Sequence, residues 1–447
     1  MDEKVRTRIA PSPTGHFHVG TARTALFNYV YAKQHDGDFV LRIEDTDAKR
    51  NKPEFETDII EQMAWLGLSP DETYRQSELV KSHKDAIQKL IDEDKAYISK
   101  EPSKEDASKE VAVVRLRNKG ETVAFSDLIR GEISFDTAEL GDFVIARSID
   151  EPLYHLAVVV DDAEMNITHV IRGEDHISNT PRQMLIGRAL GYMTPVYAHL
   201  PLILAPDKSK MSKRKHSFAI VKQLREDGFD PKAINNFLML LGWSPGNDRE
   251  RFSMDEVIQA FNIQHVHKGG AVFDVEKLKW LNGEYLRKMD ENDFAKKALA
   301  LLEDADIPEF NQATGAKLIP QIKERIAVWS DIPDMAKAGE FDYYFVSPEL
   351  DKAMLVWKDA TLEETKIHLL HIQAIFETAE ETVFEDPEAI KGLIWKYAEL
   401  KGKGAVLWPL RYALSGKERS PDPFSIMSIL GKGEVLSRIQ NALSYVS

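Results

Sequence analysis

The sequence contains no cysteine among its 447 residues. This absence excludes disulfides, thiolate zinc sites, iron–sulfur clusters and cysteine nucleophiles, and it fits a reducing compartment. No apolar run reaches the roughly 18 residues of a transmembrane helix. The N-terminal segment lacks the apolar stretch of a signal peptide and carries Asp2 and Glu3, whereas transit peptides are poor in acidic residues. We therefore predict a soluble, cytoplasmic protein with no membrane partner.

Positive charge is also scarce, since 58 Lys and Arg stand against 73 Asp and Glu, a formal net charge of −15. A protein that wraps nucleic acid indiscriminately should be basic, so any nucleic-acid contact must use local patches. The hydrophobic fraction of 43% and the charged fraction of 29% are typical of folded globular chains. At about 150 residues per domain, the length predicts roughly three domains.

The N-terminal segment predicts a strand–helix–strand unit. Residues 5–10 and 39–43 have the apolar pattern of strands, and apolar side chains recur at helical spacing over residues 22–30. Asp36-Gly37 marks the end of that helix. Such a unit implies a parallel sheet, whose ligands bind at the carboxyl ends of its strands. The candidate side chains at such ends are Ser12, His18 and Glu44.

The rest of the chain predicts a division into several parts. Residues 102–151 consist of short strand-like pieces and indicate a small inserted β-rich module. Residues 154–160 and 167–172 resume the parallel-strand pattern, so the insertion splits one sheet domain. Beyond about residue 290, nearly every segment has the pattern of an amphipathic helix. We predict an α/β multidomain fold with sheet-domain halves at 1–95 and 151–205, an insertion at 96–150, a loop and helical connector at 206–300, and a helical domain at 301–447.

Two polar segments have features suited to phosphate. The first runs from Pro13 to Thr21, where a helix N-terminus with unpaired N–H groups follows a turn containing His18. The second is the basic loop from Lys208 to Lys215, which has five cations. Taken singly, the first could be a plain strand-to-helix turn and the second a solvated charged loop.

The order of these segments resembles the class I aminoacyl-tRNA synthetases, in which HIGH and KMSKS motifs flank a split Rossmann domain. The matching residues here are His18-Val19-Gly20-Thr21 and Lys210-Met211-Ser212-Lys213-Arg214. The stretches RIAPSPTGHFHVGTARTALFN, FVLRIEDTD and VVVDDAEMNITHVIRGEDHISNTPRQ narrow the resemblance to glutamyl-tRNA synthetase of the bacterial type. It covers essentially the whole chain. It implies a split Rossmann-type sheet, an inserted acceptor-stem-binding module and an all-helical anticodon-binding domain.

The resemblance also implies an amino-acid site. In similar enzymes the arginines matching Arg8 and Arg172 hold the side-chain carboxylate of glutamate, because a guanidinium fork pairs bidentately with a carboxylate. Glu44 is then expected to take the α-ammonium group. The other residues of this site are Ala10, Ser12, Tyr154 and Val158.

For ATP, the resemblance implies three groups of residues. The phosphates are expected at His18, Gly20 and Thr21, the ribose near Glu174 and Asp175, and the adenine at the backbone of Leu202 and Ile203. The basic loop is expected to hold the leaving pyrophosphate through Lys210, Ser212, Lys213 and Arg214, with His18, Lys210 and Lys213 as catalytic residues. Mg²⁺ is expected as the partner of ATP.

Two departures from the family pattern stand out. Thr21 replaces the second histidine of the HIGH motif, so one phosphate-side imidazole is absent. The inserted module is short and has no cysteine, so we expect no zinc. For tRNA, we expect a local basic patch that includes Lys401, Lys403 and Arg411.

The implied function is that of a glutamate–tRNA ligase, acting as a monomer on L-glutamate, ATP and tRNA-Glu. Charging of tRNA-Gln and a need for tRNA in activation stay open. The alternatives are a noncatalytic paralogue, a tRNA-modifying paralogue and the glutaminyl enzyme. The helical C-terminal third argues against a small paralogue and against the β-barrel of the glutaminyl enzyme. The presence of Arg8, Glu44, Arg172 and Lys213 argues against a noncatalytic copy.

Overall fold

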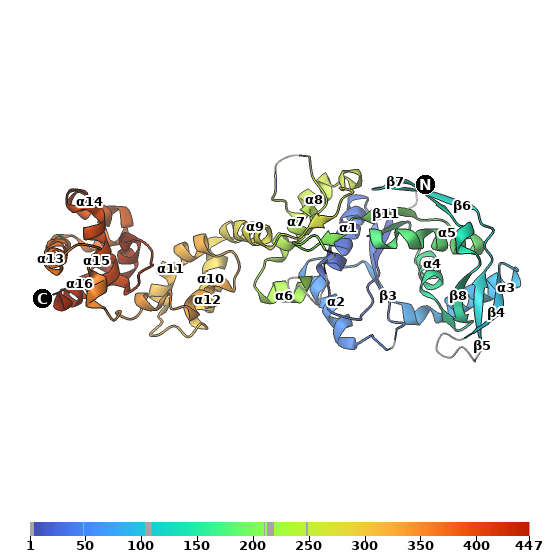
Figure 1. Cartoon of the computed structure of the whole chain (residues 1–447), viewed down its shortest axis with the longest axis horizontal. Helices are drawn as coiled ribbons and strands as arrows, with labels where there is room; N and C mark the ends of the chain where they lie inside the picture. Colours follow the sequence, from blue (N-terminus) through green and yellow to red (C-terminus); the bar gives the residue numbers. More distant parts are fainter. Residues whose placement is uncertain are drawn as a thin grey trace. The chain divides into compact units, whose positions relative to one another are not determined.

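The computed structural model describes residues 4–47, 49–102, 110–209, 211, 219–246 and 249–446. The chain forms two compact units, Met1–Tyr285 and Leu286–Ser447, whose elements are labelled in Figure 1. Within the described ranges, no helix is both long and apolar enough to cross a membrane.

The first unit opens with a three-stranded parallel sheet. Its strands are β1 (Arg6–Ile9), β2 (Asp38–Ile43) and β3 (Glu72–Arg75), in that order. Helix α1 (Val19–Gln34) connects the first two strands and α2 (Pro53–Trp65) the next two. The buried side chains of α1 include Ala22, Leu26 and Val30, the helical spacing that the sequence predicts. The first strand–helix–strand prediction is therefore confirmed.

The second half of the sheet lies beside the first. Strands β10 (His169–Gly173) and β11 (Val196–Leu200) are parallel and joined by α5 (Thr180–Leu190). The amide of Thr168, just before β10, donates to the carbonyl of Arg6 in β1 at 3.0 Å. Residues near the carboxyl ends of β1 and β10 can therefore share one site.

The prediction of a strand at residues 154–160 is wrong, because this segment begins helix α4 (Tyr154–Glu164). Its buried side chains include Leu156 and Val160, which are four residues apart and therefore share a helix face. Three consecutive valines, 158–160, favour a strand by intrinsic propensity. Burial of one helical face against the rest of the unit overrides that local preference.

The insertion is β-rich, as predicted. Strands β4 (Ala96–Pro102), β5 (Glu110–Leu116), β8 (Phe143–Ser148) and β9 (Glu151–Pro152) form an antiparallel sheet. The hairpin of β6 (Thr122–Asp127) and β7 (Gly131–Asp136) instead joins the parallel sheet, in the order β10-β11-β6-β7. The junction is the pairing of Asp127 with Tyr197.

The remaining elements of the first unit are mostly helical. They are η1 (Gln76–Leu79), α3 (Val80–Asp92), η2 (Ala138–Leu140), η3 (Glu174–Asn179), β12 (Ile203–Leu204), α6 (Val221–Glu226), α7 (Pro231–Leu240), α8 (Met254–Ala260), η5 (Ile263–His265), β13 (Ala271–Val272) and α9 (Val275–Arg287). The two short strands β12 and β13 pair in parallel.

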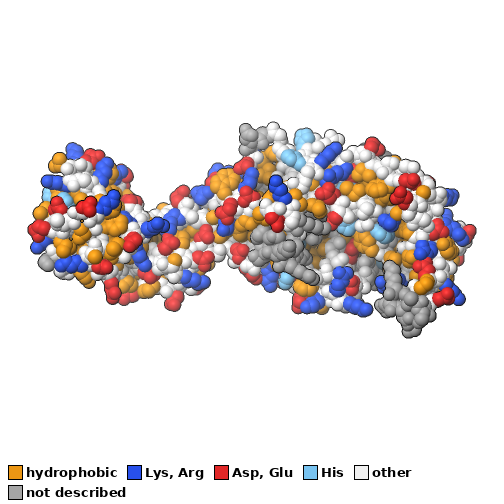
Figure 2. Space-filling model, in the orientation of Figure 1, with side chains coloured by type: hydrophobic (Ala, Val, Ile, Leu, Met, Phe, Trp, Pro, Cys, Tyr) orange, Lys and Arg blue, Asp and Glu red, His pale blue; other side chains and the backbone are white. Residues whose placement is uncertain are grey.

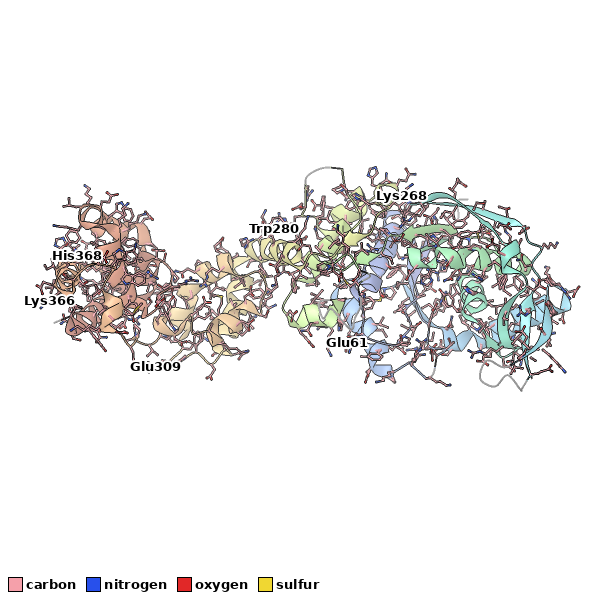
Figure 3. The ribbon with its side chains drawn as sticks, in the orientation of Figure 1. Glu61, Lys268, Trp280, Glu309, Lys366 and His368 are labelled. Atoms are coloured by element: carbon pink, nitrogen blue, oxygen red, sulfur yellow. The ribbon has the colours of Figure 1, made fainter. Side chains whose placement is uncertain are left out.

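All elements described in the second unit are helices. Its elements are α10 (Glu291–Glu303), α11 (Gln312–Arg325), α12 (Asp331–Lys337), η6 (Asp342–Tyr344), η7 (Lys352–Leu355), α13 (Leu362–Thr378), η8 (Glu381–Glu385), α14 (Pro387–Lys401), α15 (Lys403–Ser415) and α16 (Pro423–Tyr445). One apolar core joins them. Beside it, His368 of α13, labelled in Figure 3, contacts the Tyr397 hydroxyl at 2.8 Å. The predicted fold, a parallel-sheet domain followed by a helical domain, is confirmed.

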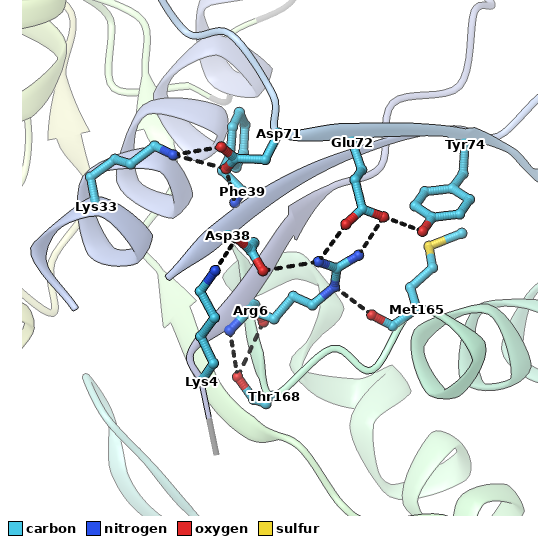
Figure 4. Close-up of polar contacts among 10 residues, drawn as sticks. All are labelled: Lys4, Arg6, Lys33, Asp38, Phe39, Asp71, Glu72, Tyr74, Met165 and Thr168. Atoms are coloured by element: carbon cyan, nitrogen blue, oxygen red, sulfur yellow. Dashed lines mark hydrogen bonds and ion pairs between the residues drawn. The ribbon is translucent and has the colours of Figure 1, made fainter. Parts of the chain in front are cut away.

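The edge at which β1, β2 and β3 begin is closed by ion pairs (Figure 4). Arg6 donates to Asp38 at 3.1 Å and to both carboxylate oxygens of Glu72 at 2.9 and 2.8 Å. Its Nε also donates to the carbonyl of Met165, at the end of α4, at 2.6 Å. Charges at this edge thus neutralise one another. The polar groups at the opposite edge, where β1 and β10 end, surround a cavity instead.

Candidate active site

A cavity of about 570 Å³ lies at the carboxyl ends of β1 and β10. Most of the predicted site residues line it: Arg8, Ala10, Ser12, His18, Gly20, Thr21, Glu44, Tyr154, Val158, Arg172, Asp175, Leu202 and Ile203. Glu174 does not line the cavity itself. Its carboxylate accepts a hydrogen bond at 2.8 Å from the amide of Leu202, which does. Lys210, Ser212, Lys213 and Arg214 fall outside the described residues, while Met211 among them lines the cavity.

One wall of the cavity is a buried network of charges. Arg8 donates from Nε and Nη2 to the two carboxylate oxygens of Asp162, at 3.0 and 3.3 Å. Arg42 of β2 donates to the same Asp162 at 2.6 Å and to Glu44 at 3.2 Å. Asp162 therefore binds two guanidiniums and fixes the orientation of Arg8 toward the cavity.

Burial and charge act in opposite directions in this network. Burial alone would raise the pKa of Asp162, but Arg8 and Arg42 lower it overall. For Glu44, burial raises the pKa and outweighs the lowering by Arg42 and Arg8. The two arginines thus do not fully stabilise the charged form of Glu44, and a ligand ammonium group would stabilise it further.

Arg172 is buried, and no carboxylate pairs with it among the residues that the structure describes. It is 6% exposed, and no described Asp or Glu oxygen lies within 4.0 Å of its guanidinium. Its nitrogens donate to the Thr180 hydroxyl at 2.8 Å and to His199 Nε2 at 3.2 Å. Burial consequently lowers its pKa. A buried cation in a cavity wall is costly unless an anion joins it, so Arg172 is suited to a ligand carboxylate.

The N-terminus of α1 forms another wall of the cavity. His18 caps the helix, and its Nδ1 accepts from the Gly20 amide at 3.0 Å. The neutral ring therefore carries its proton on Nε2, which can donate to an anion. A Cβ on Gly20 would lie 3.2 Å from His18 Nδ1, so the ring would have to shift by a few tenths of an ångström to accept a larger residue there.

Sequence reasoning missed several residues of this site, among them Asp162, Arg42 and Arg23. Arg23 of α1 lines the cavity and donates to the carbonyls of Pro201 and Leu241. Its burial lowers its pKa to about 10. The available signal was a charge within an apolar run, since Arg42 and Asp162 both occur in otherwise buried segments.

Comparison with known proteins agrees with this geometry. The sequence profile of the class I tRNA synthetases (E and Q), catalytic domain, matches residues 4–106 and 98–280, and that of the anticodon binding domain matches 284–443. The chain is 38% identical to the glutamate–tRNA ligase of Aquifex aeolicus, covering 99% of this chain and 100% of the relative. It is 39% identical to the enzyme of Francisella tularensis subsp. novicida, covering 98% and 99%.

Solved structures give the same answer. A glutamate tRNA ligase from Elizabethkingia meningosepticum, in complex with its amino acid, is 32% identical with a TM-score of 0.86 and full coverage of both chains. The glutamate–tRNA synthetase of Elizabethkingia anophelis is 33% identical with a TM-score of 0.83, covering 99% of this chain and 100% of that one. The chain belongs to the glutamate–tRNA ligase family of class I aminoacyl-tRNA synthetases.

Proposed function

We propose that the cavity is where L-glutamate and ATP react to glutamyl-adenylate, before the glutamyl group passes to the 3′-terminal ribose of tRNA-Glu. The observation that supports this most is Arg172, a buried guanidinium in the cavity wall with no carboxylate partner among the described residues. The side-chain carboxylate of glutamate supplies the missing charge. Neither a noncatalytic nor a tRNA-modifying paralogue accounts for the full-length relationship to glutamate–tRNA ligases.

Two ends of the bound amino acid are then recognised by opposite charges. Arg172 and Arg8 receive the side-chain carboxylate, and Asp162 holds Arg8 in place by two hydrogen bonds. Glu44 receives the α-ammonium group, in keeping with its raised pKa. Val158 contributes contact without a side-chain hydrogen bond. The remaining members of this proposed site are Ala10, Ser12 and Tyr154.

In the proposed reaction, a glutamate α-carboxylate oxygen attacks the α-phosphorus of ATP. A bond to phosphorus forms while the α–β bridge bond breaks, and pyrophosphate departs with the negative charge. No proton has to be removed, so positioned donors and cations supply most of the catalysis. His18 Nε2–H and the amides at the start of α1 are suited to that charge. From the family motif, Lys210 and Lys213 are proposed for the pyrophosphate, with Ser212 and Arg214.

We propose the rest of the ATP site and its metal on the same grounds. Asp175 and Glu174 are assigned to the ribose, and Leu202 and Ile203 to the adenine. The substrate is expected to be the Mg²⁺ complex of ATP. The described residues contain no group of three His, Asp or Glu side chains placed to hold a metal. Such a site fits an ion held mainly by phosphate oxygens.

For tRNA, we propose that the insertion at 96–150 contacts the acceptor stem, that 206–300 forms the basic loop and connector, and that the helical domain at 301–447 reads the anticodon. Acidic and basic side chains are interspersed on the face shown in Figure 2, so local patches must attract the polyanion. The patch proposed on the helical domain includes Lys401, Lys403 and Arg411. Since charged tRNA is consumed in translation, we also propose a cytoplasmic location, and a monomeric state by resemblance.

The deciding experiment is aminoacylation of purified tRNA-Glu and tRNA-Gln transcripts with labelled glutamate, with glutamine and aspartate as control amino acids. Charging of tRNA-Glu alone would support a discriminating enzyme. Charging of both would support an enzyme that makes Glu-tRNA-Gln as an intermediate. If folded protein charges neither, the proposed function is wrong.

A further inference from the structure

The turn of the β6–β7 hairpin does not line the cavity. Its hydrogen bonds lead to the proposed glutamate site and to the proposed adenine site. Asp127 ends β6, is 2% exposed, and accepts hydrogen bonds at Oδ1 from the amides of Ile129 at 2.9 Å and Arg130 at 2.8 Å. The Leu128 amide donates to the Tyr197 carbonyl at 2.9 Å. Gly131, at φ +82°, completes the turn in a conformation that favours glycine. These contacts fix the turn to β11.

From this turn, a first chain of hydrogen bonds leads to the proposed glutamate site. Asp127 Oδ2 lies 2.6 Å from His199 Nδ1, and His199 Nε2 lies 3.2 Å from Arg172 Nε. Because a guanidinium nitrogen can only donate, His199 Nε2 must accept, and the ring proton must sit on Nδ1. Asp127 therefore selects the tautomer of His199 that can hold Arg172.

The surroundings of His199 favour the neutral ring that this chain requires. Burial lowers its pKa, which outweighs the opposing effect of Asp127, and the nearby Arg172 lowers it further. With Nε held by His199 and Nη2 by Thr180, the Arg172 fork has two anchors. An anchored fork loses little conformational freedom when it binds a carboxylate.

A second chain of hydrogen bonds leads to the proposed adenine site. Arg130 Nη2 donates to Glu174 Oε2 at 2.6 Å, and Glu174 Oε1 accepts from the Leu202 amide at 2.8 Å. Arg130 also donates to the carbonyls of Lys268, labelled in Figure 3, at 2.7 Å and His199 at 3.2 Å. One guanidinium thus ties the hairpin to the backbone that lines the cavity at Leu202.

We propose that Asp127 and Arg130 are positioning residues for the two substrates, Asp127 acting through His199 and Arg172 on glutamate, and Arg130 acting through Glu174 and Leu202 on ATP. The proposal rests on the function proposed above. It makes the insertion part of substrate recognition. If the turn only supported the fold, substitutions in it would change KM for glutamate and KM for ATP alike. Measuring the two KM values separately therefore distinguishes the two cases.

The test compares aminoacylation by the full-length protein and its Asp127→Ala and Arg130→Ala variants, varying glutamate and ATP separately. We expect Asp127→Ala to raise KM for glutamate by about tenfold or more, as for loss of a charged hydrogen bond, with KM for ATP within about twofold of wild type. Arg130→Ala should show the reverse pattern. Asp127→Asn keeps the size of the side chain but replaces one accepting oxygen by an NH₂ donor, which must face either His199 Nδ1–H or the amides of Ile129 and Arg130. It should therefore raise KM for glutamate in the same direction as Asp127→Ala.

Matched controls come from exposed members of the same region. Asp136, at the other end of the hairpin, accepts a local bond from the Ala138 amide and no other side-chain bond from a described residue, and Arg188 of α5 pairs with Glu121 at 3.0 Å. Asp136→Ala and Arg188→Ala should leave both KM values unchanged. Introduced into a His199→Phe background, Asp127→Ala should add nothing to KM for glutamate, because the connection is already broken.

Each outcome supports or opposes the proposal. Equal increases in both KM values, a change in kcat alone, or an additive effect of Asp127→Ala on His199→Phe would overturn it. If Asp127→Ala does not fold, Asp127→Asn and Arg130→Ala still provide the comparison. A wild-type protein that charges no tRNA would count against the proposed function, whereas an active wild type with indifferent variants would count against the positioning roles alone.

Discussion

At the scale of single residues, the site depends on charges taken out of water. Arg8 and Arg42 form ion pairs with Asp162, whereas Arg172 donates hydrogen bonds only to neutral groups among the described residues. The sequence identified Arg8 and Arg172 through a family motif. The charge of Asp162 within a buried segment was a local signal, but the sequence could not pair this residue with Arg8, because the two are 154 residues apart. The same holds for Asp127 and His199, which are 72 residues apart.

Arg172→Met should abolish glutamate binding while leaving the fold intact. The variant removes a buried cation along with two hydrogen bonds, and these effects oppose each other, so its unfolding free energy should stay within about 1 kcal/mol of wild type. Glutamate should raise the Tm of the wild type but not that of the variant. Thermal unfolding with and without saturating glutamate measures both.

Arg438→Met is the matched control for that experiment. Arg438 is 2% exposed but donates to Glu434 at 2.7 Å and to the carbonyl of Tyr343 at 2.6 Å, within the helical unit. Its loss should lower the Tm and preserve the shift caused by glutamate. A glutamate-induced shift of wild-type size in Arg172→Met would contradict the assigned role.

Gly20→Ala should damage catalysis through His18. The new Cβ would lie 3.2 Å from His18 Nδ1, so the ring must shift by a few tenths of an ångström from the position in which it caps α1. We expect the rate of adenylate formation to fall by up to about tenfold, which is less than the roughly hundredfold or more that complete loss of one donor to a developing charge causes, because the ring is displaced and not removed. ATP–pyrophosphate exchange in the presence of tRNA-Glu measures this rate.

The control for this substitution is Gly392→Ala in α14, where a Cβ would meet no atom within 4 Å. This change should raise the unfolding free energy by about 0.5–1 kcal/mol, as for Ala replacing Gly in a helix, without altering exchange. Normal exchange by Gly20→Ala would show that the position of the His18 ring is not critical.

At the scale of elements, local pattern predicted the parts whose burial is periodic. The first strand, α1 and β2 all follow from apolar spacing and the Asp36-Gly37 stop. Helix α4 does not, because Val158–Val160 favour a strand locally while burial of a helical face decides the outcome. The pairing of β6 with β11 could not be predicted from local pattern either, because it joins segments that are distant along the chain.

Glu72→Gln should make the free energy of unfolding decline less steeply as the pH is lowered. Hydrogen bonds from Arg6 and from the Tyr74 hydroxyl lower the pKa of Glu72 from 4.5 to about 2. The unfolded chain therefore takes up the proton first, and a contribution present above pH about 4.5 is lost as pH falls toward 2. Unfolding in urea between pH 6 and 3 should show a shallower decline for the variant.

Because Glu72 is partly exposed, the effect should be small. Glu61→Gln, at the exposed residue of α2 labelled in Figure 3, is the control and should follow the wild-type profile. Identical slopes for wild type and Glu72→Gln would mean that the ion pairs shown in Figure 4 do not stabilise the strand-start edge.

At the scale of the whole molecule, an acidic chain with a net charge of −15 must bind a polyanion. Lys401 and Lys403 are exposed at the junction of α14 and α15. Lys403 Nζ lies over the Trp395 ring at 4.2 Å and pairs with Glu399 at 3.3 Å. A basic group beside an indole offers both charge and a stacking surface to an RNA strand.

Reversing these charges in the double variant Lys401→Glu, Lys403→Glu should raise KM for tRNA-Glu, more so at low salt, because attraction to phosphates becomes repulsion. KM values for glutamate and ATP should not change, since the proposed residues for those substrates all belong to the first unit. The control is Lys401→Arg, Lys403→Arg, which keeps the charge. An unaltered KM for tRNA in the reversed variant would remove this patch from the tRNA surface.

The pairing of β6 with β11 also determines which parts of the insertion can be removed or exchanged. An insertion between two halves of a domain suggests a removable module that could be trimmed or exchanged between relatives. Here its hairpin joins the sheet at the pairing of Asp127 with Tyr197, so excision would expose that part of the β11 edge, and open strand edges recruit other chains into aggregates. Engineering of this region must therefore retain β6 and β7 as part of the scaffold and confine exchange to the separate four-stranded sheet.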